Sequence, residues 1–382
     1  MQKSKYTSKS WVEVSEKAIF ENIASFRKIL SKKTKIAAVI KANAYGHDIK
    51  TVSELISPKI DLFAVDSIYE ALKIRKTGIK KPIIVLGYTL LKDINLAINS
   101  DISFVCYNKE TVKKIIDLKL NKIAKVHLKI ETGTNRQGLS INEAIKLAKE
   151  ISKYKDKIYI EGIYTHFANI EDTLNPDFAM LQLEKFNEAK GIFENKIGKI
   201  DYYHCAASAA TILYPSTHFN LIRLGISLYG IWPSKEVKIA NLHKTKKSLQ
   251  LKPVLSWKSV VAQIKNIDKG DSVSYGRTWI ATKKTKIAVI PVGYFDGFDR
   301  KLSNLGRVLI NGKYAQVIGR IAMNMFMVDV THIKSVKVED EVVIIGEQKG
   351  NVISADVIAD KLGTISYEVL CRINPLIPRI VI

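Results

Sequence analysis

Short apolar runs alternate with amphipathic stretches over the first two thirds of the chain. Apolar runs of about four to eight residues, bounded by polar or glycine-containing segments, are typical of strands buried on both faces. Eight such runs can be marked between residues 10 and 245: Ile36–Lys41, Leu62–Val65, Pro82–Leu86, Ile102–Cys106, Lys125–Glu131, Ile158–His166, Ile200–His204 and Leu221–Leu224. The stretches between them repeat their apolar residues at helical spacing, as in Ser15–Leu30, Ser67–Lys76, Ile141–Tyr154 and Pro176–Asn195.

The order of these elements predicts a fold class. Ser140 is followed three residues later by Glu143, which fits the reciprocal capping box at the start of a helix. Strand–helix units in series predict an α/β fold with a TIM-type (β/α)8 barrel over residues 10–245, an architecture of about 250 residues. A doubly wound open sheet is the structural alternative, but no glycine-rich turn follows the first strand to support a dinucleotide site.

After residue 250 the pattern changes to strands with few helices. The candidate strands are Val254–Ile264, Ser272–Tyr275, Lys286–Tyr294, Arg307–Ile318, Met325–Val330 and Glu341–Ile345, and one helix is expected at Ser354–Leu362. Turn-forming residues such as Asn311-Gly312 separate the strands. The pattern predicts a second, mostly β domain over residues 250–382.

The composition allows a large buried core, and its charge bears on the kind of partner to expect. Hydrophobic residues make up 47% of the 382 residues, so disorder is not expected. Sixty Lys and Arg against 37 Asp and Glu give a net charge of +23. Such a balance is compatible with nucleic acid or an anionic membrane surface. Because the basic residues are scattered along the chain, a solvated basic surface is favoured over either partner.

The sequence has few cysteines and no long apolar run, and these features bear on metal binding and on the cellular compartment. Cys106, Cys205 and Cys371 are too few and too far apart for a disulfide framework or a zinc cluster, so no metal is expected. No apolar run reaches the roughly 18 residues of a membrane helix. The amino terminus has no apolar core of the kind that a signal peptide needs. We therefore expect a soluble, cytoplasmic protein.

Chemically capable residues collect at the ends of the predicted barrel strands, where barrels of this type build their active sites. Lys41 ends the first apolar run. A lysine in that position either snorkels to the surface or is held in the mouth of the barrel, and its run alone does not decide between the two. In the second case desolvation would lower its pKa and make it a nucleophile suited to forming a Schiff base.

Other strand ends carry polar residues as well. Arg136 follows Gly133, which permits a tight turn, and a guanidinium placed over the barrel mouth could hold a carboxylate, although a surface arginine is the plainer interpretation. His166 and His204 end the sixth and seventh strands, where each is compatible with a core histidine. Ser208 and the end of the eighth strand at Arg223 are candidates for a phosphate site.

Together these residues resemble one family. The segment Ala38–His47 resembles the cofactor-lysine signature of bacterial alanine racemases, and the similarity continues in order along nearly the whole chain. Its further motifs are Phe63–Val65, Glu131–Gly133, Thr165–Ala168, Arg223–Ile226, Ser272–Thr278, Pro291–Tyr294, Gly319–Arg320 with Met323, and Ile365–Glu368. The resemblance implies a fold-type III enzyme that uses pyridoxal 5′-phosphate to interconvert L- and D-alanine, supplying D-alanine for peptidoglycan in the cell wall.

The resemblance also implies roles for individual residues. Lys41 would hold the cofactor and serve as the base on one face of the substrate, and Tyr275 would serve as the base on the other face, contributed by the partner subunit of a homodimer. The expected cofactor-binding residues are Lys41, Tyr45, Arg136, His166, Ser208, Arg223, Gly225, Ile226 and Tyr367. Arg136 and Met323 would bind substrate, and the supporting residues would be Lys129, matching a lysine often carbamylated, Tyr294, Arg300 and Arg320.

The chemistry explains these residue types. Racemisation removes the Cα proton from one face and returns a proton to the other, so two bases must flank the carbon. The cofactor ring delocalises the carbanion charge. Arg223 beside the pyridine nitrogen cannot readily give up a proton, so that nitrogen should stay unprotonated. Tyr275 is a poor base at its reference pKa of about 10 and needs nearby cations to ionise.

Three positions depart from the family pattern, and two other functions compete. Ala207, Asn324 and Glu171 stand where the family usually has Asn, Asp and Asp. They affect the expected placement of phosphate, Tyr275 and entering substrate, but none removes a proton-transfer group. A broad-specificity amino-acid racemase is the nearest alternative function. A non-catalytic barrel that carries pyridoxal phosphate is the second, and such proteins lack a second domain.

Overall fold

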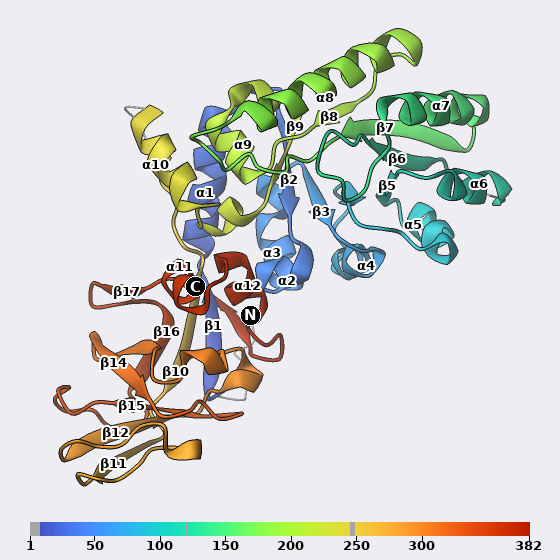
Figure 1. The fold of residues 1–382 in the computed structure, drawn as a ribbon. Coiled ribbons are helices and arrows are strands. Elements are labelled where there is room, and N and C mark those ends of the chain that lie inside the picture. The colour runs from blue at the N-terminus through green and yellow to red at the C-terminus, as the bar shows by residue number, and fades with distance from the viewer. Residues whose placement is uncertain (1–7, 120, 245–248) are drawn as a thin grey trace. The chain divides into compact units, whose positions relative to one another are not determined.

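Eight parallel strands form a nearly closed barrel in the part of the chain from Ala18 to Ala44 and from Val52 to Lys252 (Figure 1). The computed structural model describes residues 8–119, 121–244 and 249–382. The strands are β2 (Lys35–Val39), β3 (Leu62–Val65), β4 (Ile83–Val85), β5 (Ser103–Cys106), β6 (Ala124–Lys129), β7 (Ile158–Tyr164), β8 (Tyr202–His204) and β9 (Leu221–Leu224), in the order β8-β7-β6-β5-β4-β3-β2-β9. All eight predicted apolar runs are confirmed as strands, and the predicted barrel class is confirmed.

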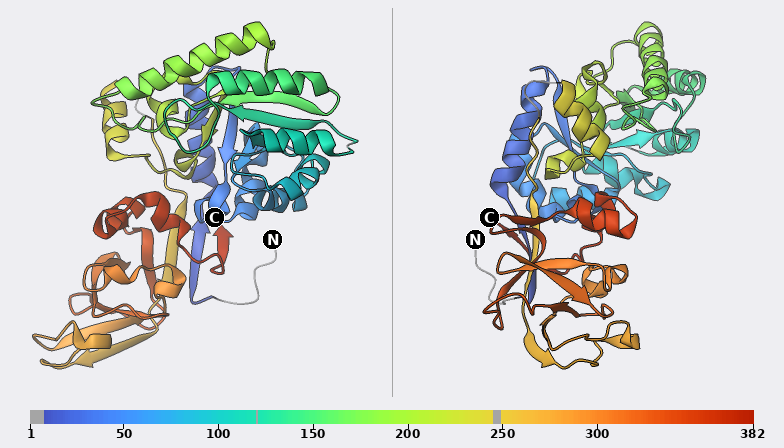
Figure 2. Two further views of the ribbon diagram at one scale, coloured as in Figure 1. Left: turned by 45° about the vertical axis from the view of Figure 1, so that its right-hand side comes forward. Right: turned by 60° about the vertical axis from the view of Figure 1, so that its left-hand side comes forward.

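Helices follow the strands in sequence and lie outside them, as Figure 2 shows from two further sides. They are α1 (Glu16–Ile29), α2 (Lys41–Tyr45), α3 (Ile49–Ile56), α4 (Ile68–Lys76), α5 (Ile94–Asn99), α6 (Lys109–Asp117), α7 (Ile141–Ile151), α8 (Asp177–Lys196), α9 (Ser208–Leu213) and α10 (Lys235–Lys244). The expected capping box is present: Ser140 Oγ accepts from the Glu143 N–H, and the Glu143 carboxylate accepts from the Ser140 N–H at 2.9 Å.

The barrel strands are held by apolar burial on both faces. Every residue of β3 and of β5 is buried, and Phe63 and Phe104 are fully so. Burying one such side chain contributes about 1.5–3 kcal/mol relative to leaving it in water. The absence of alternation in these runs is therefore the physical signature of strands covered by helices outside and by side chains inside.

A mostly antiparallel sheet forms the core of the second unit, in the order β11-β12-β15-β14-β13-β16-β10-β1-β18, with β17 paired to β16. Its strands are β1 (Ser10–Val14), β10 (Leu255–Val260), β11 (Gln263–Ile267), β12 (Thr285–Ile290), β13 (Arg307–Ile310), β14 (Lys313–Ile318), β15 (Phe326–Asp329), β16 (Glu341–Gln348), β17 (Asn351–Ile353) and β18 (Arg379–Val381). Helices α11 (Ala355–Leu362) and α12 (Ser366–Cys371) belong to the same unit.

The structure corrects several sequence predictions in this unit. The run Val254–Ile264 is two strands, and Arg307–Ile318 is a hairpin that turns at Asn311-Gly312, where both residues have positive φ. The predicted strand Ser272–Tyr275 is wrong: Ser272 makes only an isolated bridge to Ile280, and a 3₁₀ turn begins at Tyr275. Left-handed backbone at Ser274 and Gly276 ends the extended conformation there.

Two segments distant in sequence complete the β-rich unit. Strand β1 pairs antiparallel with β10 and parallel with β18, so the first strand of the chain lies in this sheet and not in the barrel. The segment Tyr45–Thr51 also belongs here, because the Arg379 guanidinium donates to the Gly46 carbonyl at 2.8 and 3.1 Å. Neither pairing has a local sequence signal.

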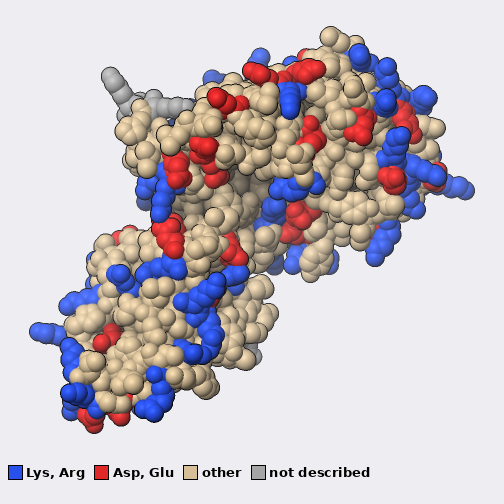
Figure 3. Space-filling view, in the orientation of Figure 1, with Lys and Arg blue, Asp and Glu red and all other residues tan. Residues whose placement is uncertain are grey.

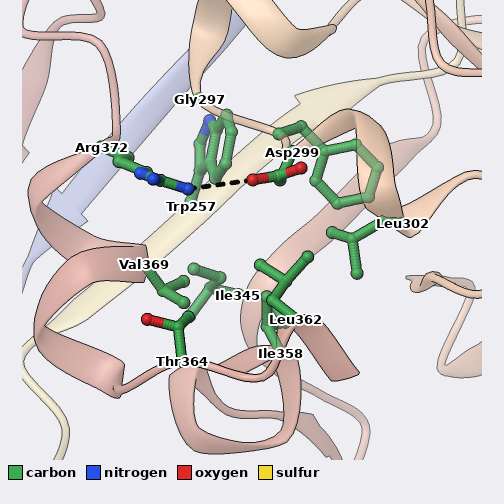
Figure 4. A pocket seen from close by; sticks show the side chains of 11 residues that line it. Trp257, Gly297, Asp299, Leu302, Ile345, Ile358, Leu362, Thr364, Val369 and Arg372 are labelled. Atoms are coloured by element: carbon green, nitrogen blue, oxygen red, sulfur yellow. Dashed lines mark hydrogen bonds and ion pairs between the residues drawn. The ribbon is translucent and has the colours of Figure 1, made fainter. Parts of the chain in front are cut away.

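A small pocket of about 10 Å³ lies against Trp257 in the β-rich unit (Figure 4). Apolar side chains such as Ile345 and Val369 line it, and the Arg372–Asp299 ion pair at 3.0 Å lies beside it. A volume of about 10–15 Å³ holds at most one water molecule. This cavity is a packing feature and is not the candidate active site.

Basic residues are widely distributed on the face of the protein that Figure 3 shows. On the face shown in Figure 3, Lys and Arg are spread over both units and interspersed with Asp and Glu. Among the described residues, no helix is long and apolar enough to cross a membrane. On this face the distribution is that of a solvated basic surface.

Candidate active site

Lys41 directly follows β2 and begins a left-handed turn. Residues Ala42–Ala44 have φ between 51° and 54° and ψ between 46° and 50°. This conformation costs L-residues roughly 1–2 kcal/mol each. Glu70 holds the turn, since its carboxylate accepts from the backbone N–H of Ala42 at 2.7 Å and of Asp66 at 2.8 Å. Strain maintained in this way is characteristic of functional sites.

The ammonium group of Lys41 has a carboxylate partner. Its Nζ lies 3.5 Å from Asp66 Oδ1, and its side chain is 42% exposed. The Lys41 side chain is therefore partly solvated, whereas its apolar run alone left this placement open. A partly solvated lysine beside an aspartate must lose its proton before it can attack an aldehyde, because only the neutral amine is nucleophilic.

Arg223 on β9 is the most strongly held side chain of the barrel mouth. Its Nη1 donates to His204 Nδ1 at 2.8 Å and to the His204 carbonyl at 3.0 Å. Its Nη2 donates at 2.9 Å to the carbonyls of Thr165 and Cys205. Four of its five N–H groups thus have acceptors, and among the described residues the Nε–H has none. A buried guanidinium with one free N–H is suited to an acceptor such as an aromatic ring nitrogen.

His166 follows the end of β7 in a strongly cationic environment. Burial, followed by the charges of Arg223 and Arg136, lowers the pKa of His166 to about 3. Its Nδ1 lies 3.3 Å from Arg223 Nη2. The ring is therefore neutral at physiological pH and can pack against a flat cofactor without adding charge.

Lys129 and Arg136 bring further positive charge to this end of the barrel. Lys129 is only 2% exposed, and burial, with the charges of Arg136 and Arg223, lowers its pKa to about 8. Gly133 has φ of 142°, which confirms the tight turn expected before Arg136. Arg136 itself is exposed, as a residue that meets an incoming anion must be.

Ser208 organises the loop after β9. Its Oγ accepts from the Gly225 N–H at 3.1 Å and from the Ser227 N–H at 3.3 Å. The Ile226 N–H has no acceptor among the described residues. The Ser208 hydroxyl proton and this N–H are available to a phosphate oxygen, whereas the Gly225 N–H is already used within the loop.

The remaining predicted site residues lie in the β-rich unit. Tyr45 and Tyr367 have ring centroids 5.9 Å apart. Tyr275 is 71% exposed. The flanking turn is fixed by Ser274, whose Oγ donates to the Arg320 carbonyl at 2.6 Å. The phenol of Tyr275 therefore projects from a well-anchored turn, as a proton-transfer group must.

Tyr294 and Met323 lie on two loops that are held against each other. The N–H of Tyr294 donates to the Ala322 carbonyl at 3.1 Å, and the N–H of Phe295 donates to the Met323 carbonyl at 3.0 Å. The Met323 N–H has no acceptor among the described residues, so it is free to bind a ligand. Arg300 lies in the 3₁₀ turn Arg300–Leu302, farther along the same loop.

Gly293 makes this loop contact possible. A Cβ added there would lie 2.2 Å from the Ala322 oxygen and 2.3 Å from the Met323 oxygen. We expect Gly293→Ala to lower the free energy of unfolding by about 1–3 kcal/mol, because overpacking displaces the backbone. Urea denaturation measures the change.

Gly191→Ala is the matched control. Gly191 lies within α8, and no atom stands within 4 Å of its added Cβ. This substitution should stabilise the protein by about 0.5–1 kcal/mol, as alanine favours a helix. An unchanged urea midpoint in Gly293→Ala would contradict the steric argument.

Both units match families of known proteins. Residues 14–233 match the family described as alanine racemase, N-terminal domain, and residues 254–381 match alanine racemase, C-terminal domain. The chain belongs to the alanine racemase family. It is an enzyme of that family, as the sequence motifs indicated.

Individual alanine racemases resemble the chain over its full length. The alanine racemase of Leptospira interrogans serogroup Icterohaemorrhagiae serovar copenhageni is 41% identical over 99% of this chain and 97% of its own length. Alanine racemase 2 of Caldanaerobacter subterraneus subsp. tengcongensis is 38% identical over 97% and 94%. The solved alanine racemase from Bacillus anthracis with bound L-Ala-P has a TM-score of 0.92 at 33% identity, covering 99% of this chain and 96% of that one.

The structure distributes the predicted site residues between its two units. Lys41, Lys129, Arg136, His166, Ser208, Arg223, Gly225 and Ile226 lie in the barrel unit, and Tyr45, Tyr275, Tyr294, Arg300, Arg320, Met323 and Tyr367 lie in the β-rich unit. Sequence reasoning missed Asp66 and Glu70, which hold Lys41 and its turn. An aspartate that ends a buried apolar run, followed four residues later by a glutamate, was the available signal.

Two of the departures from the alanine racemase pattern can be placed in the structure. Ala207 stands at the amino-terminal cap of α9, where no side chain caps the helix. Burial, with the nearby charge of Glu236, raises the pKa of Glu171. Nothing in the structure explains Asn324.

Proposed function

We propose that this protein interconverts L-alanine and D-alanine with pyridoxal 5′-phosphate, and so supplies D-alanine for peptidoglycan. The observation that carries the proposal is the buried Arg223, whose Nε–H is free among the described residues. Because a guanidinium has donors and no acceptor atoms, it suits an unprotonated ring nitrogen. An acidic residue at this point would instead protonate the ring and favour other reactions of amino acids. Family membership supports alanine as the substrate.

The barrel residues fit pyridoxal phosphate at each of its functional groups. Lys41 provides the amine that bonds to the aldehyde carbon. Neutral His166 packs against the ring, and Arg223 faces the ring nitrogen. Ser208 and Ile226, together with Tyr45 and Tyr367, bind the phosphate, and Gly225, whose N–H donates to Ser208, shapes the loop that holds it. When bound, the cofactor supplies an electron-withdrawing ring that lowers the energy of a carbanion at Cα.

Two side chains of the protein move the proton. Lys41 takes or returns the Cα proton on the face from which it holds the cofactor, and Tyr275 does the same on the opposite face. After one turnover, the base that removed the proton is protonated and the base that returned a proton is deprotonated. These are the protonation states that the reverse reaction needs, so racemisation runs in both directions.

A homodimer completes the site in this proposal. We propose that Tyr275 acts on substrate held in the barrel of the other subunit, and that the β-rich domain over residues 250–382 supplies this base to the cofactor-binding barrel over residues 10–245. The 71% exposure of Tyr275 supports a role outside its own unit's core. A cytoplasmic location remains a prediction.

The substrate pocket is expected to be small and anion-binding. Arg136 holds the substrate carboxylate and the phenolic oxygen of the cofactor, and the Met323 N–H supports the same carboxylate. Tyr294 and Tyr367 narrow the entrance, with Arg300 and Arg320 farther out. A narrow entrance favours alanine over the larger side chains that a broad-specificity racemase accepts.

The decisive experiment is an assay of purified protein with pyridoxal phosphate. L-Alanine, L-serine and L-lysine are supplied separately, and each D-enantiomer is quantified by chiral chromatography. We expect D-alanine to form fastest. No D-alanine would refute the racemase proposal in favour of a cofactor carrier, and faster formation of D-lysine would establish the broad-specificity alternative.

Lys129 is expected to react with carbon dioxide. Its pKa of about 8 leaves a substantial neutral fraction near neutral pH, whereas an ordinary lysine is almost fully protonated there. Only the neutral amine forms a carbamate, so occupancy at constant dissolved CO₂ should rise as pH increases from 6 through 8. The carbamate would place a negative charge beside Arg136 and orient it.

This prediction is measured by ¹³C NMR with ¹³C-labelled bicarbonate. A carbamate resonance should appear in the wild type and be absent from Lys129→Met. The control Lys76→Met removes an exposed lysine of α4 and should leave the resonance unchanged. A resonance that persists in Lys129→Met would assign the carbamate to another lysine.

A further inference from the structure

A buried chain of hydrogen bonds leads from Arg223 across the barrel interior. His204 Nε2 lies 2.9 Å from His127 Nδ1, and His127 Nε2 lies 3.0 Å from Glu161 Oε2. The Ser103 hydroxyl donates to the same carboxylate oxygen at 2.6 Å. We call these five residues the histidine chain. They come from five strands, β9, β8, β6, β7 and β5, and both imidazoles are fully buried.

The ends of the histidine chain determine where every proton lies. Arginine can only donate, so His204 Nδ1 must be an acceptor and the His204 proton must be on Nε2. His127 Nδ1 then accepts that proton, and His127 donates from Nε2 to Glu161. A cationic His127 would require both nitrogens of His204 to accept, which would make His204 an imidazolate. Both histidines are therefore neutral and share one tautomer.

The electrostatics agree with this assignment. Burial, with the charge of Arg223, holds the pKa of His204 well below its usual range. Burial acts to raise the pKa of Glu161, but hydrogen bonds from His127 and Ser103 outweigh it and the net direction is downward. The chain thus runs from a guanidinium to a carboxylate through two neutral rings, an arrangement in which each bond polarises the next.

Local backbone features are built around the histidine chain. The β6–β7 pairing shifts between Val126↔Ile160 and His127↔Gly162, so Glu161 is an extra, unpaired residue whose side chain the bulge turns inward. A Cβ at Gly162 would lie 2.3 Å from His127 Nδ1, so only glycine leaves room for the ring. Tyr202 stacks on His127 with an interplanar angle of 11°.

A second stacked ring fixes the other imidazole. Tyr164 lies on His204 with centroids 4.7 Å apart and an interplanar angle of 5°. The guanidinium carbon of Arg223 lies 5.2 Å from the centroid of the same Tyr164 ring. Rotation of either imidazole would lose both stacking and hydrogen bonds, so the chain has one well-defined arrangement.

We propose that Glu161 and His127 are positioning residues for the reaction: they fix the acceptor tautomer of His204, which in turn aims the Nε–H of Arg223 at the ring nitrogen of the cofactor. Without the carboxylate, His127 can carry its proton on Nδ1, and His204 must then present an N–H to Arg223. Two donors would face each other, and the guanidinium would move. The proposal rests on the proposed function for its catalytic consequence, but the tautomers are a property of the protein alone.

The first test needs no cofactor turnover. The chain has seven histidines, so ¹⁵N-histidine labelling with assignment by single replacement can resolve each ring. In cofactor-free protein at neutral pH, His127 and His204 should both show a protonated Nε2 and an unprotonated Nδ1. Finding either ring cationic, or protonated on Nδ1, would overturn the proposal even if the protein proves to be a racemase.

The second test compares variants of Glu161. Glu161→Leu removes the acceptor, and we expect altered tautomers at His127 or His204. We also expect kcat to fall about tenfold to a hundredfold with little change in KM, the scale of a misplaced catalytic group. Glu161→Gln keeps an oxygen acceptor and should retain the wild-type tautomers and most of the activity. A loss in Glu161→Gln equal to that in Glu161→Leu would count against the proposal.

The side reaction gives a readout that a merely structural role would not change. A displaced Arg223 should let the ring nitrogen gain a proton, so the amino group is more often left on the cofactor and alanine is released as pyruvate after water adds. The ratio of pyruvate formed to alanine racemised should rise at least about tenfold in Glu161→Leu. A tenfold rise corresponds to a change of roughly 1.4 kcal/mol in the difference between the two activation free energies. Wild-type tautomers and an unchanged ratio in folded Glu161→Leu would refute the positioning role.

Tyr159→Phe is the matched control on the same strand. Its exposed phenol donates to Asp201 at 2.7 Å and, among the described residues, makes no hydrogen bond with a member of the histidine chain. This variant should keep the wild-type tautomers, kcat and pyruvate ratio. If Glu161→Leu does not fold, the wild-type tautomers and Glu161→Gln still decide the proposal. Absence of racemisation by the wild type would refute the proposed function and leave the tautomer test intact.

Discussion

Lys41→Ala is expected to lower kcat by at least about 10⁴-fold, since it removes both the covalent anchor of the cofactor and one of two proton-transfer groups, and the second role alone contributes about 10²–10⁴-fold. Covalent attachment should be lost as well. Borohydride reduction of the wild type followed by peptide mass spectrometry should find pyridoxyl phosphate on Lys41, and the variant should carry none at any lysine.

The structure makes this prediction specific to one lysine among many. Lys41 follows the barrel strand β2 and is presented by a left-handed turn that Glu70 holds in place. Lys76→Ala, in the last turn of α4, is the control and should retain both attachment and activity. Residual racemisation above about a hundredth of the wild type in Lys41→Ala would contradict the assignment of Lys41 as anchor and base.

Tyr275→Phe is expected to abolish proton removal from L-alanine while leaving the cofactor attached. Losing the phenol should lower kcat about 10²–10⁴-fold in both directions, because racemisation needs both bases. Lys41 remains able to act on its own face. In D₂O the variant should therefore exchange the Cα hydrogen of D-alanine with retention of configuration and leave L-alanine unlabelled, as measured by proton NMR.

The asymmetry of this exchange separates a two-base reaction from a one-base reaction. Tyr314→Phe is the control, since Tyr314 is a half-exposed tyrosine of the same unit whose hydroxyl donates to the Val352 carbonyl at 3.1 Å. It should racemise at the wild-type rate. Equal labelling of both enantiomers by Tyr275→Phe, or full activity in that variant, would rule out Tyr275 as the second base.

Most of the barrel could be predicted from the sequence because its signals are local. A strand covered on both faces must be apolar throughout, as β3 and β5 are, and the helices between strands repeat at 3.6 residues. The capping box at Ser140 was also readable, since all its groups lie within four residues. Positions such as Lys41 and Arg223 followed from the strand ends, because barrels place chemistry there.

The β-rich unit was less predictable because its pairings are distant in sequence. Strand β1 joins β10 across more than 240 residues, as in Val12↔Trp257, and no local pattern encodes such a partner. The run Val254–Ile264 reads as one strand, but its two halves pair with different neighbours and so become β10 and β11. Likewise, the periodicity around Tyr275 suggested a strand where positive φ values make a turn.

The sequence by itself determined the class of barrel, the strand that presents Lys41 and the family to which the chain belongs. These depend on residue types in order along the chain. Only the tertiary structure decided how the residues are held: the Asp66 partner of Lys41, the left-handed turn beside Glu70, and the histidine chain that ends at Arg223. Hydrogen bonds and burial depend on distances between separate strands, and folding alone sets those distances.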